Sequence, residues 1–269
     1  MTEIAITSNI TADRIKKYLK EGKRFDGRIP EQFRNIEIEY NVSKKAEGSA
    51  RVKLGNTEVI VGVKMDVTTP YPDSMDKGNL MTSAELLPLS SSRFESGPPA
   101  FESIELGRII DRGLRESGFI DFTKLVIKEG EKVWGLFVDI YTINDDGNLI
   151  DAAAIGAVAA LKSARLPKYD EETEKVVYGE FTNTKLPISK EPLISMSVYK
   201  IGDTFVVDPT REEEDIVEAR VTIGRLGDTI SSIQKSNDGS FSLEEINNVI
   251  DMAEKVSKDI FKKIEKQLE

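Results

Sequence analysis

The sequence has no cysteine and no histidine among its 269 residues, and it has a single tryptophan. Without cysteine there can be no disulfide, no zinc finger and no cysteine nucleophile. Without histidine there is no imidazole general base, so a serine–histidine–aspartate triad is excluded as well. Any chemistry performed by this chain must therefore use Asp, Glu, Lys, Arg or Tyr side chains, or a bound ion.

Long apolar runs are also missing from the sequence. No segment approaches the roughly 20 consecutive apolar residues that a helix needs to span a bilayer. The first ten residues, MTEIAITSNI, lack the basic start and the apolar core of a signal peptide. We therefore expect a cytoplasmic protein with no membrane partner.

Acidic residues outnumber basic residues by 47 to 37, so the formal net charge is −10. This balance argues against indiscriminate binding of polyanions. A local basic patch stays open, because charges are screened over a Debye length of about 8 Å at physiological salt. The length allows one large domain or two small ones.

The apolar pattern changes period several times along the chain. Residues 11–23 have helical spacing, and Thr11 or Asp13 can begin the helix. Alternation over residues 34–67, with a turn at Leu54–Thr57, predicts an antiparallel meander. The pattern then predicts a strand at 80–89, a helix at 101–117 with Ile104, Ile109 and Leu114 facing inward, a strand at 133–143, and a tightly packed, small-residue helix at 150–164.

The second part of the chain repeats the order of strands followed by a helix. Residues 166–187 have the composition of an exposed, charged connector. Ser242 and Glu245 form a capping-box signature at the start of a C-terminal helix. Strands are expected before it at 193–200, 204–207, 216–223 and 229–234. The expected organisation is an N-terminal extension at 1–30, a first half at 31–166, a connector at 167–191 and a second half at 192–269.

Five short motifs occur in a fixed order. They are RFDGR at 24–28, GSARV at 48–52, ELGRIIDRGLR at 105–115, DDGNLIDAA at 145–153 and VDPTREEE at 207–214. In this order they resemble the RNase PH family, and within it the non-catalytic ring subunit of archaeal exosomes. One motif alone would be a weak signal, but the five together span nearly the whole chain.

The resemblance implies an α/β fold with mixed sheets, built from two pseudo-duplicated βαβ-type halves. It also implies a ring in which three copies of this subunit alternate with three copies of a catalytic RNase PH-like subunit. Single-stranded RNA threads the central channel of such a ring and is degraded phosphorolytically from its 3′ end. RNA-binding cap proteins are further expected partners, and no cofactor is expected.

Two departures from the catalytic pattern predict that this chain has no catalytic residue of its own. Phosphorolysis needs cationic or N–H donors for phosphate, and an acid or a metal-binding carboxylate near the leaving oxygen. Catalytic members of the family carry Gly-Gly-Ser/Thr-Arg after the Asp-Gly turn, whereas here Gly147–Asp151 has no arginine. Their pair of acids six residues apart corresponds here to Glu214 and Arg220, and an arginine cannot act as the acid. The alternative is a self-sufficient phosphate-dependent 3′–5′ exoribonuclease.

Three arginines share one face of the helix expected at 101–117. Arg108, Arg112 and Arg115 are spaced i, i+4 and i+7. The spacing alone favours an ordinary solvated face, because Asp111–Arg115 and Arg112–Glu116 are both i,i+4 pairs. The resemblance favours RNA-phosphate contacts for Arg108 and Arg112, since RNA-contacting arginines of the family lie on this helix. For Arg115 the two interpretations stay open.

Arg93 is a further candidate RNA contact, in the polar loop at 90–99. The resemblance favours this role, and the neighbouring Glu95 argues against it. Two Asp- and Gly-containing turns, at 145–147 and 238–245, fail the calcium-loop template, and the acidic run at 212–215 fits a solvated segment better than a cation site. No metal site is expected. A free-standing interaction module without an RNA role is a third functional alternative.

Overall fold

The computed structural model describes residues 7–268 of the chain. Residues 1–6, which begin the predicted N-terminal extension, and residue 269, which ends the predicted second half, lie outside the described residues. Within the described part, the two groups of strands predicted from the sequence form two separate main sheets.

The first sheet contains the predicted meander. β1 (Ile36–Tyr40), β2 (Gly48–Leu54) and β3 (Thr57–Thr68) pair antiparallel in sequence order. β6 (Lys132–Asn144) pairs antiparallel with β3, and β4 (Asn79–Glu85) pairs parallel with β6 at the edge. The short β5 (Val126–Lys128) also pairs with β6. The turn predicted between β2 and β3 is confirmed, and Gly55 takes a left-handed φ of 58° there.

Two helices contact the strands of this first sheet. α2 (Phe101–Arg115) contacts β4, and α3 (Leu149–Ser163) contacts β2 and β3. A Cβ atom added to Gly156 of α3 would come within 2.7 Å of a Val61 methyl carbon. The small residues of α3 therefore allow the close approach that the sequence predicted. α3 also contacts β9 of the second sheet, so this helix joins the two halves.

The second sheet is antiparallel throughout. Its order is β10 (Thr204–Val207), β9 (Leu193–Ile201), β11 (Ala219–Leu226) and β12 (Thr229–Ser236). α5 (Leu243–Leu268) contacts β9 and β11 and reaches β1 of the first sheet. The predicted capping box is confirmed: the Ser242 N–H donates to Glu245 at 2.7 Å, and the Glu245 N–H donates to the Ser242 hydroxyl at 3.2 Å.

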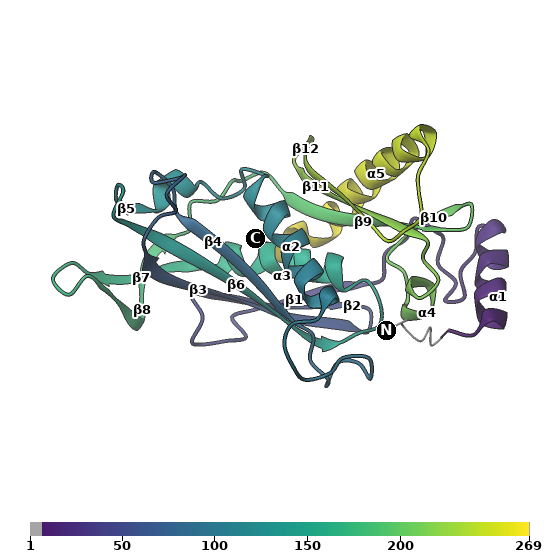
Figure 1. The fold of residues 1–269 in the computed structure, drawn as a ribbon, viewed down its shortest axis with the longest axis horizontal. Coiled ribbons are helices and arrows are strands. Elements are labelled where there is room, and N and C mark those ends of the chain that lie inside the picture. The colour runs from purple at the N-terminus through teal and green to yellow at the C-terminus, as the bar shows by residue number, and fades with distance from the viewer. Residues whose placement is uncertain (1–6, 269) are drawn as a thin grey trace.

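The segment predicted as a connector is a β-hairpin, which corrects the prediction for residues 166–187. β7 (Arg165–Asp170) and β8 (Lys175–Lys185) pair antiparallel as a separate two-stranded sheet. The hairpin projects at one end of the long axis (Figure 1). Most residues of β8 are exposed on both faces, so the strand lacks the apolar alternation by which a half-buried strand is detected.

Three smaller predictions are also corrected. α1 spans Asn9–Lys20 and is capped by Ser8, whose hydroxyl accepts the Thr11 N–H, so neither Thr11 nor Asp13 begins it. Ile104 on α2 is half exposed, because the sheet side of α2 takes the buried residues Leu106, Ile109, Ile110 and Leu114 instead. The strand predicted at 80–89 ends at Glu85.

Candidate nucleic-acid interface and the start of α3

The arginine face of α2 divides into two kinds of residue. Arg108 and Arg112 are exposed, and among residues 7–268 neither side chain has a hydrogen bond or an ion pair. In particular, the i,i+4 pair between Arg112 and Glu116 does not form. The two guanidinium groups are one helical turn apart and therefore present unpaired cations on the same side of the helix.

Arg115 is bound to its own chain. It donates to both oxygens of Asp111, at 2.9 and 2.8 Å, and to the carbonyl oxygen of Leu80 on β4 at 2.8 Å. The hydrogen bonds with Asp111 raise the pKa of Arg115. The structure therefore separates Arg115 from the two unpaired arginines of the same face.

Arg93 belongs to a group of charges around α4 (Arg211–Glu214). Its guanidinium donates to the Asp215 carboxylate at 2.6 Å. Burial raises the pKa of Asp215, but the hydrogen bonds from Arg93 and Thr7 together with the charges of Arg211 and Arg93 leave that pKa lowered. Arg211 also pairs with Asp215, at 3.1 Å, and with Asp145, at 3.3 Å. Both arginines here are thus neutralised by carboxylates.

The start of α3 is occupied by a carboxylate. Asn148 takes a left-handed φ of 60° and caps the helix, and its backbone N–H donates to Glu214 at 3.0 Å. Helix N-termini with open N–H groups attract anions in general. A side chain of α4 already accepts the hydrogen bond.

A second carboxylate, Asp151, is buried in the first turn of α3. It accepts the Ser197 N–H at 2.9 Å and the Asn148 amide at 3.1 Å. Burial raises the pKa of Asp151 to about 7, although both hydrogen bonds lower it. Glu214 therefore makes the start of α3 an unfavourable position for a phosphate, and Asp151 adds a negative charge there as the pH rises through about 7.

Arg220, which the resemblance predicts to stand where catalytic members carry an acid, is buried in an ion pair. Its guanidinium donates to Glu105 of α2 at 2.8 Å, and the Ser236 hydroxyl donates to the same carboxylate oxygen. The pair links α2 to the second sheet. Its two charges satisfy each other, so neither is free for proton transfer.

The sequence motifs do not by themselves single out the buried Asp208, which belongs to the fifth motif and connects it to the first and the fourth. Its carboxylate accepts from Arg28 at 2.8 Å, from Arg34 at 2.7 Å and from the Asn148 amide at 3.0 Å. The neighbouring Arg24 is fully buried against Glu213. A signal was present in the sequence: the first motif is basic and the last is acidic, which suits mutual pairing.

No group of three or more acidic side chains within residues 7–268 is arranged to hold a metal ion. The same residues contain no helix long and apolar enough to cross a membrane.

Family models match most of the chain. Residues 32–167 match domain 1 of the 3′ exoribonuclease family, RNase PH, and residues 191–256 match its domain 2. The chain belongs to the RNase PH family. The mixed α/β sheets of this family member, predicted from the motifs, are confirmed.

Relatives place this RNase PH-family chain more narrowly. It is 47% identical to the exosome complex component Rrp42 of Thermococcus onnurineus, over 98% of this chain and 97% of the relative. It is 41% identical to a chain of the Archaeoglobus fulgidus exosome with RNA bound to the active site, with a TM-score of 0.85 over 95% of this chain and 98% of that one. A chain of an archaeal exosome core is 39% identical, with a TM-score of 0.83 over 96% and 97%. The predicted resemblance to archaeal exosome components is confirmed.

Proposed function

We propose that this RNase PH-family chain is a non-catalytic, RNA-binding structural subunit of an archaeal exosome ring. In this proposal three copies alternate with three copies of a catalytic RNase PH-like subunit in the cytoplasm, and cap proteins bind the ring. Single-stranded RNA passes along the α2 face to the catalytic subunit, where phosphate cleaves it from the 3′ end. The likeness to Rrp42 components and to the archaeal exosome core supports the structural part. The halves 31–166 and 192–269, with the segments 1–30 and 167–191, are the proposed domain organisation.

One observation supports the absence of catalysis above all others: Glu214 accepts the Asn148 N–H at the start of α3. A phosphate bound there would have to displace this carboxylate and lie near the buried Asp151. Like charges at such short range strongly disfavour binding in a partly buried position. The ion pair of Arg220 with Glu105 supports the loss of the second requirement, an acid near the leaving oxygen, because an arginine held by a carboxylate cannot act as that acid.

The RNA-binding part of the proposal rests on Arg108 and Arg112. Phosphate contacts hold a strand in place without reading its sequence, and an unpaired, exposed arginine makes such a contact at the smallest cost. Arg115 and Arg93 would first have to give up Asp111 and Asp215. We therefore propose that these two arginines contribute less to RNA binding.

Phosphate-dependent release of nucleoside diphosphates from labelled RNA tests the proposal. The chain alone should show no release, and adding the catalytic subunit should restore it. Turnover by the isolated chain that depends on phosphate would instead establish the alternative, a self-sufficient exoribonuclease. Mass measurement of the co-expressed pair should give an alternating hexamer.

A further inference from the structure

A second surface of the chain combines cations with aromatic rings. It lies on α1 and the turn that follows it, at the opposite end of the molecule from the β7–β8 hairpin (Figure 1). Arg14, Lys17 and Lys23 are exposed, and none has a hydrogen bond or ion pair from its side chain within residues 7–268. Three unpaired cations thus occur within ten residues of a chain whose net charge is strongly negative.

Two aromatic side chains lie among these cations. The rings of Tyr18 and Phe25 meet edge to face at 5.1 Å between centroids, and the Arg14 guanidinium lies 5.8 Å from the Phe25 ring. Phe25 is 45% exposed and Tyr18 is 37% exposed. The backbone at Phe25 is fixed, because the adjacent Arg24 is buried in its bonds to Glu213. A rigid exposed ring needs little further ordering before it binds a flat ligand.

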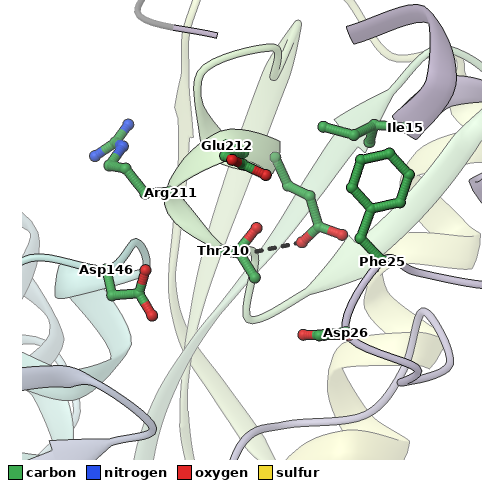
Figure 2. A pocket seen from close by; sticks show the side chains of 8 residues that line it. Ile15, Phe25, Asp26, Asp146, Thr210, Arg211 and Glu212 are labelled. Carbon is green, nitrogen blue, oxygen red and sulfur yellow. Dashed lines mark hydrogen bonds between the residues drawn. The ribbon is translucent and has the colours of Figure 1, made fainter. Parts of the chain in front are cut away.

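Beyond the Phe25 ring most charged side chains are acidic, and Arg211, which lies there too, is paired with Asp145 and Asp215. Phe25 and the apolar Ile15 line a cavity of about 350 Å³ whose wall also carries Asp26, Asp146 and Glu212 (Figure 2). The Glu212 carboxylate is exposed and has no partner among the described residues. Cations, an aromatic face and an acceptor therefore follow one another across this surface.

We propose that this α1 surface, made by Arg14, Lys17, Tyr18, Lys23 and Phe25 with Glu212 at its edge, binds single-stranded RNA. A nucleotide presents the complementary order of groups: a phosphate, a flat base and, on adenine, cytosine and guanine, an exocyclic amine. Bases stack on aromatic side chains irrespective of sequence, and lysine and arginine follow the backbone. An acidic peptide fits less well, because Asp26 and Glu212 would repel its carboxylates and it has no flat base to stack on the exposed Phe25 ring.

The α1 surface would bind the same ligand as the α2 face, single-stranded RNA, so this inference rests on the proposed function, but the two surfaces lie on different helices. α2 lies against the first sheet, whereas α1 contacts α4. The two surfaces can therefore be disabled separately, and each experimental outcome points to one of them.

The test measures binding of labelled ten-nucleotide oligo(C) and oligo(U) to the full chain, alone and in the assembled ring. In an R108A/R112A background, which removes the α2 face, adding F25L, K17A and K23A should weaken oligo(C) binding by roughly tenfold or more. The slope of log Kobs against log salt concentration should become shallower by about 1.4, which is about 0.7 for each of the two lysine–phosphate contacts that are lost. Adding K262A and K263A, two exposed lysines of α5, is the matched control and should change nothing.

Several results would overturn this inference. The inference fails if the RNA binding that remains in the R108A/R112A chain is unchanged after F25L, K17A and K23A are added. An equal loss of RNA affinity in the α5 control would also overturn it, and so would displacement of RNA by an oligo-glutamate peptide at lower concentration than by unlabelled oligo(C).

Oligo(C) should bind more tightly than oligo(U), and E212Q should reduce that difference. The surface variant K17E/K23E repeats the test without touching Phe25. If R108A/R112A alone has no effect, the α2 part of the proposed function fails while the α1 surface stands.

Discussion

The α2 face and the region around the start of α3 both carry arginines, but they use them in opposite ways. On α2, Arg108 and Arg112 have no partner within residues 7–268. Around α4, Arg93 and Arg211 are both held by Asp215. In a chain with a net charge of −10, an arginine is available to a polyanion only where the chain's own carboxylates do not reach it.

The difference comes from how acids are distributed around the two regions. α4 and the residue after it contribute four acidic side chains in succession, Glu212–Asp215. On α2, two acids are already paired with other arginines: Glu105 with Arg220 of β11, and Asp111 with Arg115 of the same helix. The ion pairs around α4 therefore stabilise the fold, whereas Arg108 and Arg112 on α2 have no carboxylate partner within residues 7–268.

The largest effect is expected from breaking the paired region at Asp208. D208A leaves Arg28 and Arg34 buried without their carboxylate, so the free energy of unfolding should fall by about 3–5 kcal/mol. Urea denaturation measures this loss. D146N is the control, because Asp146 also contacts Arg34 but is about one-third exposed, and it should cost below about 1 kcal/mol. Equal losses in the two variants would show that the buried pairing carries no special stability.

A smaller effect concerns Asp151 and its pH dependence. Its folded-state pKa of about 7 lies above the ordinary value of 3.8, so the folded protein binds the proton more tightly than the unfolded chain. Stability contributed by this proton is present at low pH and is lost as pH rises through about 7. When the pH rises from about 5 to about 8, the free energy of unfolding of the wild type should fall by about 2–3 kcal/mol relative to that of D151N.

Urea denaturation of both proteins at the two pH values gives that difference. D145N is a suitable control, since it removes a neighbouring carboxylate outside the first turn of α3. A wild-type stability that follows D151N at both pH values would mean that Asp151 titrates normally.

The smallest effect in free energy is expected on the unpaired face. In the assembled ring, R108A/R112A should make the slope of log Kobs against log salt concentration shallower by about 1.4. The loss of RNA affinity should be similar for different RNA sequences. Ring assembly and the unfolding free energy should stay the same, because neither arginine side chain makes a hydrogen bond or an ion pair within residues 7–268. Titration of labelled single-stranded RNA at several salt concentrations measures both quantities.

R115A is the matched control for the α2 face, and it should change RNA affinity by less than about twofold because Asp111 already neutralises Arg115. Equal losses in R115A and R108A/R112A would show that RNA competes successfully with Asp111. No loss in either variant would reduce the chain to a scaffold.

Much of the fold could be predicted from local patterns. The meander, the small-residue helix and the capping box at Ser242 each follow from apolar spacing or from groups within a few residues of one another. The β7–β8 hairpin escaped detection because its exposed strands lack apolar alternation. Helical spacing alone predicts an inward-facing Ile104, whereas the buried residues of α2 are Leu106, Ile109, Ile110 and Leu114.

The candidate site shows the same limit in its electrostatics. Asp111–Arg115 and Arg112–Glu116 have identical spacing in the sequence, yet only the first pair forms. Arg115 is also held by the Leu80 carbonyl on β4, an acceptor that helical spacing does not include. The neighbouring strand thus stabilises one of two equivalent local options.

The sequence by itself determined the family, through the order of five motifs, and the faces of most helices and strands, because periodicity is a local property of the chain. Only the tertiary structure decided which charges are free. Asp208 lies 180 residues from Arg28 and 174 from Arg34, and Glu214 lies 66 residues from the Asn148 N–H that it accepts. These groups meet because packing joins the two halves around α3. A guanidinium within reach of a buried carboxylate is neutralised, whereas one on an outer helix face beyond the reach of the chain's own carboxylates stays unpaired.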